Sequence, residues 1–323
     1  MDRLKIYSQT DLTELISYRE GETKLGECVQ LVASLDDLAA SSAKFVLLGI
    51  PEDIGIRANH GIAGAATAWH PALKALMNIQ STGFLRGEEL LVLGHFDIAD
   101  PADTSIKGLE QKVQQIDELV YPVIRKIVAG GKIPIVIGGG HNNAYPIIKG
   151  TATALKRAID VINIDAHADL RPASGRHSGN GFSHALAQGL LNNYGLFGLH
   201  QNYNNTHILE AIVGNPNIHA VFFDDMLQSP QPPAAFWTDL LKHMDAAPGL
   251  EIDLDCIANI LSSAMTPSGF SLNEIRRLLL TPLKKFSYLH ICEGAVTLID
   301  GRQAQTTAKA IAYLISDFIK SQQ

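Results

Sequence analysis

Six side chains suited to binding metal ions occur in three short segments of the sequence. They are His141, Asp165, His167, Asp169, Asp253 and Asp255. Four carboxylates and two imidazoles, without a cysteine among them, favour a hard to borderline divalent ion such as Mn(II). Because carboxylates can bridge, six such ligands are enough for two metal ions. The sequence therefore predicts a binuclear site for two Mn(II) ions, with zinc, iron or cobalt as alternatives.

Taken alone, each of these residues is equally compatible with a structural role. A single Asp or His at a strand end often caps a helix or accepts hydrogen bonds from loop amides. The whole set is different, because four carboxylates packed together without a cation raise one another's pKa values and destabilise the fold. His177 and His184 follow the Asp169 segment, and we expect them at the mouth of the same site, within reach of a substrate.

The elements that must position these residues are strands alternating with helices. Short apolar, β-branched runs predict strands at 45–50, 90–94, 133–138, 161–165, 194–199, 220–223, 250–255 and 288–292. Helical patterns occur at 65–79, 109–129, 143–155, 183–191, 233–244, 271–280 and 306–319. This alternation is typical of an α/β fold with a mostly parallel sheet, here of about eight strands, and helices on both faces. Ligands bind beyond the carboxyl ends of the strands in such sheets, and all three donor segments fall there.

We expect one domain, residues 41–323, preceded by an N-terminal extension, residues 1–40. No internal repeat or long linker divides the chain, and a single α/β domain of this length can bury a large core. The extension is less regular in pattern and is expected to wrap the core or to contact another subunit.

Composition narrows the class of protein. The 323 residues are 46% hydrophobic and 18% charged, with a net charge of -7, and an acidic chain without a basic run argues against a nucleic-acid partner. No apolar run approaches the roughly 20 residues of a membrane span, and the first residues lack a secretory signal. The three cysteines are far apart and unpaired in pattern. We expect a soluble, cytoplasmic protein that binds a small molecule and can form homo-oligomers.

The donor motifs resemble those of the arginase/agmatinase/formimidoylglutamase superfamily, the ureohydrolases. The family's Gly-Gly-Asp-His, Asp-Ala-His-x-Asp and Asp-x-Asp motifs are matched, in the same order, by residues 139–141, 165–169 and 253–255. The similarity runs from about residue 45 to the C-terminus. It implies a three-layer α/β/α domain with a binuclear manganese site that hydrolyses guanidino or formimidoyl groups, often within an oligomer.

Carried over by position, the resemblance implies which residues hold each ion. One ion would be held by His141, Asp165, Asp169 and Asp253. The other would be held by His167, Asp165, Asp253 and Asp255. Asp165 and Asp253 would then bridge the two ions. Glu293, after the last predicted strand, matches the carboxylate that faces the amidine end of the substrate in relatives.

Within the family, the sequence is most similar to formimidoylglutamases. Loops of that branch are resembled by residues 49–59, 169–172 and 201–206. Phe182 stands where arginases place a proton-transferring histidine, unless a shift of two residues brings His184 to that place. The chain departs from the common family motifs at Gly140, Asn142 and residues 258–259, which lie next to the ligands.

The resemblance implies hydrolysis of N-formimidoyl-L-glutamate to L-glutamate and formamide, a reaction of histidine degradation. A hydroxide shared by the ions would attack the formimidoyl carbon, Asp169 or Asp255 would move the proton, and Glu293 would pair with the cationic amidine. The glutamate carboxylates would be bound by side chains on nearby loops, namely Arg57, Arg171, Arg176 and Asn180. Two alternatives stay open: an amidinohydrolase acting on agmatine, arginine or another guanidino compound, and a metal-binding family member without activity.

Overall fold

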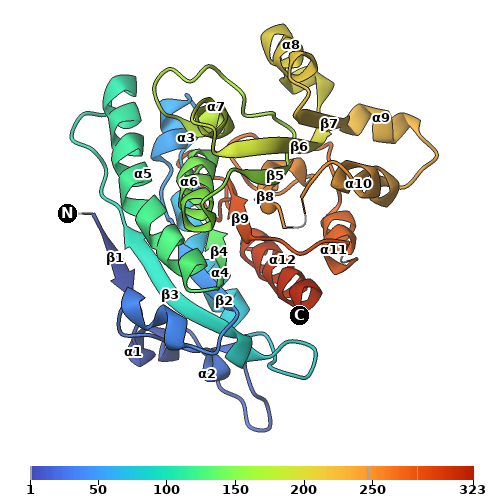
Figure 1. The fold of residues 1–323 in the computed structure, drawn as a ribbon. Coiled ribbons are helices and arrows are strands. Elements are labelled where there is room, and N and C mark those ends of the chain that lie inside the picture. Colours follow the sequence, from blue (N-terminus) through green and yellow to red (C-terminus); the bar gives the residue numbers. More distant parts are fainter. Residues whose placement is uncertain (1, 246, 282) are drawn as a thin grey trace.

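A nine-stranded sheet forms the centre of the molecule (Figure 1). The computed structural model describes residues 2–245, 247–281 and 283–323. The strands are β1 Arg3–Ile6, β2 Phe45–Gly49, β3 Leu90–Asp97, β4 Ile133–Ile137, β5 Ile159–Ile164, β6 Leu191–Leu199, β7 Ile218–Phe222, β8 Gly249–Asp253 and β9 Tyr288–Cys292. Their order across the sheet is β1-β3-β2-β4-β9-β8-β5-β6-β7. All pairs are parallel except β1 with β3, so the predicted mostly parallel sheet is confirmed with one further strand.

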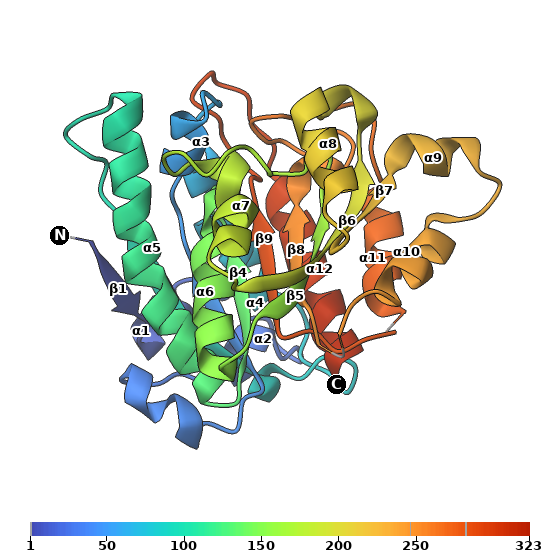
Figure 2. The ribbon, with the colours of Figure 1, turned by 45° about the horizontal axis from the view of Figure 1, so that its top comes forward.

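Helices cover both faces of this sheet. They are α1 Gln9–Thr13, α2 Leu25–Cys28, α3 Ile54–Ala58, α4 Trp69–Met77, α5 Ile106–Ala129, α6 Ala144–Leu155, α7 Gly181–Ala187, α8 Thr206–Gly214, α9 Phe223–Gln228, α10 Pro233–Leu241, α11 Leu272–Leu280 and α12 Thr306–Gln322. Figure 2 shows α5 and α6 in front of the strands and α12 behind them. The arrangement is the three-layer α/β/α fold expected from the sequence.

The central strand β2 is apolar because side chains on both of its faces are buried. In β2 every residue is buried. Phe45 and Leu47 point into the core beneath α4 and α12, whereas Val46 and Leu48 point into the core beneath α5 and α6. Successive residues of a strand face opposite sides, so a central parallel strand needs a continuous apolar run. This pattern is what made the central strands predictable.

The N-terminal segment contributes the strand that sequence patterns missed. β1 pairs antiparallel with β3, at the edge of the sheet, through the register Arg3 to Asp97 and Ile6 to Gly94. Its four residues alternate basic with apolar and are only partly buried, so they give no strand signal of their own. Leu12 and Leu25, from α1 and α2, are buried in the core beneath α4. β1, α1 and α2 thus pack against the main body of the fold.

Several short helices in the connections were also missed. α3 and α9 have five and six residues, too short for a clear helical period. α8 has nine residues, as many as α4, α10 and α11, which the sequence did predict. α8 is fixed at its start by Asn205, whose Oδ1 accepts a hydrogen bond from the Ile208 amide at 3.0 Å. Among the described residues, no helix is both long and apolar enough to cross a bilayer.

Candidate metal centre

The predicted donors meet at the carboxyl ends of four adjacent strands. β4, β9, β8 and β5 are neighbours in the sheet. His141 follows β4, Asp253 ends β8, and the Asp165 segment follows β5. Glu293 follows β9, which lies between β4 and β8. Segments far apart in the chain therefore place their side chains at one edge of the sheet.

The first group of donors surrounds one nitrogen of His141. Its Nδ1 lies 2.9 Å from Asp169 Oδ2, 3.2 Å from Asp165 Oδ2 and 3.3 Å from Asp253 Oδ2. One ligand atom from each of these four residues lies within 4.8 Å of all the others. The set provides one imidazole and three carboxylates around a single point, which suits a borderline divalent ion.

The second group shares a member with the first. His167 Nδ1 lies 3.2 Å from Asp255 Oδ2 and 3.5 Å from Asp165 Oδ1. Asp165 therefore turns one oxygen to each group, as a bridging carboxylate does. Asp253 takes part only in the first group, and its Oδ1 accepts a hydrogen bond from the Asp255 amide at 2.9 Å.

The chemistry of these donors fits a pair of divalent cations. His141 is 1% exposed. Among the residues that the structure describes, neither of its ring nitrogens has a hydrogen-bond partner, and Asp255 Oδ1 has none either. Burial, together with the neighbouring Asp255 and Asp165 carboxylates, raises the pKa of Asp253 well above its usual range. Buried, mutually repelling carboxylates and unpartnered imidazole nitrogens are what metal ions neutralise and satisfy.

The backbone is strained at two residues of the centre. Asp169 has φ 50° and Glu293 has φ 62°, in the left-handed region where a side chain costs about 1–2 kcal/mol. Glu293 is held there by its side chain, because its Oε1 accepts a hydrogen bond from the His141 amide at 2.8 Å. Burial raises the pKa of Glu293 to about 8, although the His141 amide opposes this shift. Such strain is concentrated at functional sites.

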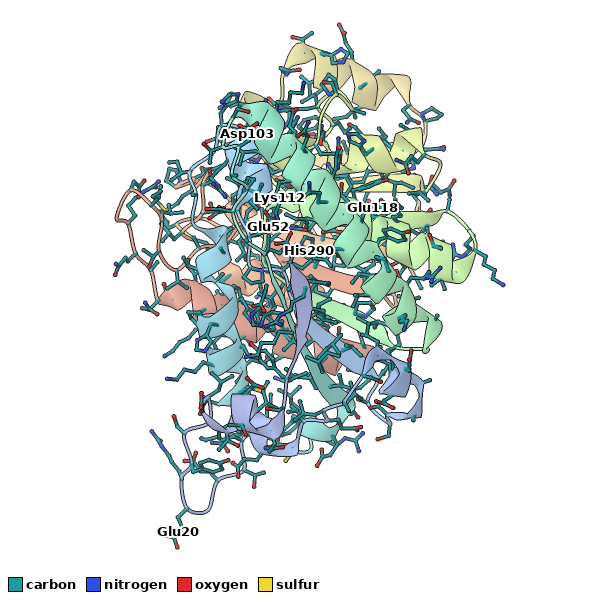
Figure 3. All side chains as sticks on the ribbon, turned by 90° about the vertical axis from the view of Figure 1, so that its left-hand side faces the viewer. Glu20, Glu52, Asp103, Lys112, Glu118 and His290 are labelled. Carbon is teal, nitrogen blue, oxygen red and sulfur yellow. The ribbon has the colours of Figure 1, made fainter. Side chains whose placement is uncertain are left out.

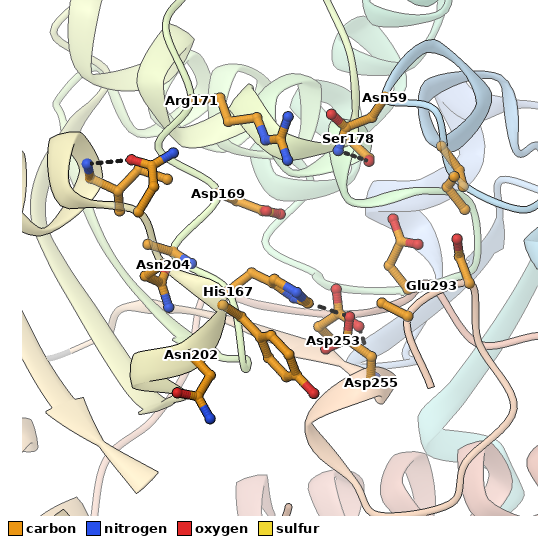
Figure 4. Close-up of a pocket in the computed structure, with 18 residues that line it drawn as sticks. Asn59, His167, Asp169, Arg171, Ser178, Asn202, Asn204, Asp253, Asp255 and Glu293 are labelled. Carbon is orange, nitrogen blue, oxygen red and sulfur yellow. Dashed lines mark hydrogen bonds and ion pairs between the residues drawn. The ribbon is translucent and has the colours of Figure 1, made fainter. Parts of the chain in front are cut away.

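A cavity of about 480 Å³ opens over the donors. Its walls include His167, Asp169, Asp253, Asp255 and Glu293. Arg171 and Ser178 lie across the cavity from Asp253 and Asp255 (Figure 4). Within the described parts of the chain, the Arg171 guanidinium makes no ion pair, and the residue is exposed. The site thus combines an acidic floor with a cation at its rim.

Arg57 is not brought to this cavity. Its Nε lies 3.0 Å from Asp53 Oδ1, and its Nη2 pairs with Asp100 Oδ1. The three residues line a separate, shallower hollow of about 310 Å³. The structure thus places Arg57, with its charge paired to two carboxylates, away from the metal donors and not in the cavity where the sequence analysis expected it.

Arg176 is buried inside the loop rather than exposed on it. It is 2% exposed, and its guanidinium donates to both oxygens of Asp117 at 2.8 and 3.1 Å. Its nitrogens also bond to Asn180 Oδ1 and to the carbonyl of Asn142, each at 2.8 Å. Arg176 and Asn180 therefore brace the loop, and the structure does not bring either of them to the lining of the cavity, where the sequence analysis expected them.

The two loop histidines also have structural partners. His184 Nε2 lies 2.8 Å from the Gly175 carbonyl, and His177 Nδ1 accepts from the Gly179 amide at 3.2 Å. Neither residue lines the cavity. Phe182 is fully buried, with its ring edge-on to His141 at 5.1 Å. The alternative in which His184 takes the place of a proton-transferring histidine therefore lacks the required geometry.

Sequence reasoning missed a buried carboxylate behind the centre. Glu52 is 3% exposed and accepts hydrogen bonds from the Gly140 amide at 3.1 Å and from Asn143 Nδ2 at 2.6 Å. Figure 3 labels it in the interior of the molecule. A Cβ at Gly140 would lie 2.5 Å from Asn142 Oδ1. The departures at Gly140 and Asn142 are thus paired, because the Asn142 side chain fills the space that a residue at 140 would need.

Other residues that line the cavity were not predicted, because the sequence around them has no metal-binding or catalytic motif. Asn59 and Ser178 face one another, with Asn59 Nδ2 donating to Ser178 Oγ at 3.2 Å. Tyr203 lines the wall and stacks on His167, with ring centroids 5.4 Å apart. Asn59 and Tyr203 fall within loops that resemble those of formimidoylglutamases, and this likeness is the sequence signal that points to them. Their spacing along the chain does not indicate contact with the metal donors.

Comparison with known proteins agrees with this arrangement. The formimidoylglutamase of Paraburkholderia xenovorans is 28% identical over 291 residues, which are 83% of this chain and 86% of that protein. The formimidoylglutamase of Streptococcus gordonii is 29% identical over 222 residues. That second alignment covers 66% of this chain and 64% of the relative, less than two thirds of its length.

A solved structure and a family model extend the comparison. The crystal structure of Trypanosoma cruzi formiminoglutamase with Mn²⁺ has a TM-score of 0.73 at 18% identity and covers 93% of this chain and 98% of that one. At that identity the likeness shows the fold. The arginase family model matches residues 43–319. With most of its length matched and its donors gathered at the edge of the sheet, the chain belongs to the arginase family.

Proposed function

We propose that this protein is a binuclear metal hydrolase that cleaves N-formimidoyl-L-glutamate to L-glutamate and formamide. The observation that carries the proposal is the pair of donor groups joined by Asp165 on the floor of a polar cavity. Support for the substrate comes from the two relatives, both named formimidoylglutamase. Manganese is the favoured metal, because the donors are carboxylates and imidazoles and the fold neighbour holds Mn²⁺.

The residues that would hold the ions follow from the two groups. One ion would be held by the first group, His141, Asp165, Asp169 and Asp253. The other would be held by the second group, His167, Asp165 and Asp255, to which the family resemblance adds Asp253. When bound, two such ions supply a water that ionises near neutral pH. Asp255 is suited to accept a proton, since its Oδ1 has no hydrogen-bond partner. Asp169 is the second candidate for this role.

Substrate would be held at both ends of the cavity. Glu293, on the floor, would pair with the cationic amidine through a charge-assisted hydrogen bond. Arg171, across the cavity, would receive a glutamate carboxylate, and Asn59 and Ser178 beside it offer further polar groups. With the aspartates neutralised by the ions, Glu293 is the acidic group on the floor and Arg171 the basic group at the rim, which suits a substrate that is cationic at one end and anionic at the other.

The proposal also covers the metabolic pathway, the cellular compartment and the oligomeric state of the protein. We infer a role in histidine degradation from the proposed substrate. Cys28, Cys256 and Cys292 are all free thiols, which favours a reducing compartment such as the cytoplasm. Homo-oligomer formation stays a prediction, to be measured by light scattering.

The test is hydrolysis by purified protein loaded with Mn(II). Release of formamide and glutamate from N-formimidoyl-L-glutamate is expected, and Asp253→Ala should abolish it. Arginine and agmatine serve as competing substrates in the same assay. Urea from either one, without formamide, would point to an amidinohydrolase. Two bound ions without turnover of any of these compounds would point to a family member without activity.

A further inference from the structure

A buried polar cluster lies beneath the metal centre, within the sheet itself. Glu251 on β8 and His290 on β9 are adjacent across the two strands, and Tyr288 lies two residues before His290. All three side chains are 0% exposed. Figure 3 labels His290 in the interior of the molecule. A carboxylate at this depth is destabilising unless its oxygens are fully used.

Both carboxylate oxygens of Glu251 have hydrogen-bond partners. Tyr288 donates its hydroxyl to Oε1 at 2.7 Å. His290 Nδ1 lies 2.5 Å from Oε2, and His290 Nε2 lies 3.2 Å from the carbonyl of Gly138. Gly138 begins the turn that leads to His141. The carboxylate is thus held from two sides, and one of its supports is tied to the backbone that carries a metal ligand.

His141 is the group that still lacks a partner. Its Nδ1 faces the three carboxylates of the first donor group, so a neutral ring that binds an ion through Nδ1 carries its proton on Nε2. Nε2 is buried and makes no hydrogen bond within normal limits. Glu251 Oε2 lies 3.6 Å from it. A small movement of the ring on metal binding would close this contact.

A purely structural role explains this cluster less well than a role in supporting the metal centre does, and so does a separate metal site. Apolar side chains would stabilise a buried strand pair without desolvating a charge. His141, His290 and Cys292 lie close enough together to form a metal site of their own. Both nitrogens of His290 already have partners, however, so this second grouping has no free imidazole to offer beyond His141.

We propose that Glu251 is a positioning residue for His141. By accepting a hydrogen bond from Nε2, it fixes the tautomer and the ring orientation in which Nδ1 meets the first ion, while Tyr288 and His290 hold the carboxylate in place. Carboxylates behind metal-binding imidazoles have this effect in other proteins. The inference rests on the proposed metal site, but it concerns ion binding and is independent of which substrate is hydrolysed.

The test measures Mn²⁺ binding directly, by equilibrium dialysis of the full-length protein, with EPR to distinguish a spin-coupled pair from a single ion. Wild type is expected to bind two ions. Glu251→Gln should weaken binding of the first ion, the one that His141 would hold, by about 10- to 100-fold. The affinity for the second ion should change by less than about threefold. Tyr288→Phe, which removes only one support of Glu251, should weaken binding of the first ion by less. Asp317→Asn, a change at a buried carboxylate on α12 that pairs with Arg276, should lower the Tm without changing either affinity.

A double variant shows whether Glu251 acts through His141. His141→Asn alone should weaken the first ion, and adding Glu251→Gln should cause no further loss if the two residues act as one unit. Wild-type affinities in Glu251→Gln, additive losses in the double variant, or equal losses of both ions in step with the Tm would each overturn the proposal. Wild type that binds two ions but releases no formamide would refute the proposed substrate and leave this inference standing. Wild type that binds no Mn²⁺ would refute both.

Discussion

Arg171→Ala tests the polarity of the cavity, which underlies the choice of substrate. Arg171 is exposed at the rim, lines the cavity with the metal donors and has no carboxylate partner among the described residues. Removing it should therefore leave folding intact, with a change in stability within about 0.5 kcal/mol. It should weaken binding of a substrate that presents a carboxylate to the rim.

The expected magnitude follows from the environment of the guanidinium. A hydrogen bond to a charged group contributes about 1.5–3 kcal/mol, and the exposed position of Arg171 favours the lower part of that range. Since about 1.36 kcal/mol corresponds to a factor of ten, a loss of about 1.5–2 kcal/mol lowers kcat/KM by roughly 10- to 30-fold. Most of the change should appear in KM, because the carboxylate is equally bound before and during reaction at the distant amidine.

The assay is formamide release over a range of N-formimidoyl-L-glutamate concentrations. Arg57→Ala is the matched control, because Arg57 is ion-paired in a separate hollow and should leave KM within about twofold of wild type. A formimidoyl amine without carboxylates should be hydrolysed equally by wild type and Arg171→Ala. An unchanged KM in Arg171→Ala, or an equal rise in Arg57→Ala, would show that the rim does not recognise the carboxylate.

Two further substitutions test the buried residues around the metal centre, and a pH series tests one of the metal donors. Arg176→Ala leaves Asp117 buried without its partner and should lower the free energy of unfolding by about 3–5 kcal/mol, as measured by urea denaturation; a loss below about 1 kcal/mol would contradict the burial of this pair. Glu52→Ala removes the acceptor for several buried donors and should destabilise by at least about 3 kcal/mol, with a lower Tm even when metal is absent. Burial alone lowers the pKa of His167, but the Asp255 carboxylate reverses this and raises it well above its usual value. Without cations the ring is therefore protonated and metal must displace that proton, so Mn²⁺ affinity should rise with pH and binding should release protons; dialysis at several pH values that gave a constant affinity would refute this.

Much of the fold was predictable because its information is local. The central strands are buried on both faces, and β2 is a continuous apolar run, whereas β5 and β8 are mostly apolar runs that include buried polar residues such as Asn163 and Glu251. The edge strand β1 was not predictable, since only its pairing with β3 makes it a strand. The six-residue helix α9 gives too little helical period to be distinguished from a loop.

The chemistry of the centre could be inferred from spacing along the chain. Donors such as Asp165 and His167, or Asp253 and Asp255, are two residues apart and follow predicted strands, and their types indicate metal binding. In the structure β5 ends at Ile164 and Leu254–Cys256 form a 3₁₀ turn, so neither pair lies within one extended segment. Motif order added the likeness to ureohydrolases. Neither inference needs to know which strands are neighbours.

Tertiary contacts decide which side chains line the site and which side chains hold the lining residues in place. The order β4-β9-β8-β5 places Glu293 between His141 and Asp253, although it comes last in the chain. The same order brings Glu251 beside His290. Arg57, Arg171 and Arg176 are equivalent as loop cations in the sequence, and their partners separate them: two are neutralised by carboxylates and one is not. Contacts between distant segments follow from strand order and register, which spacing along the chain does not encode.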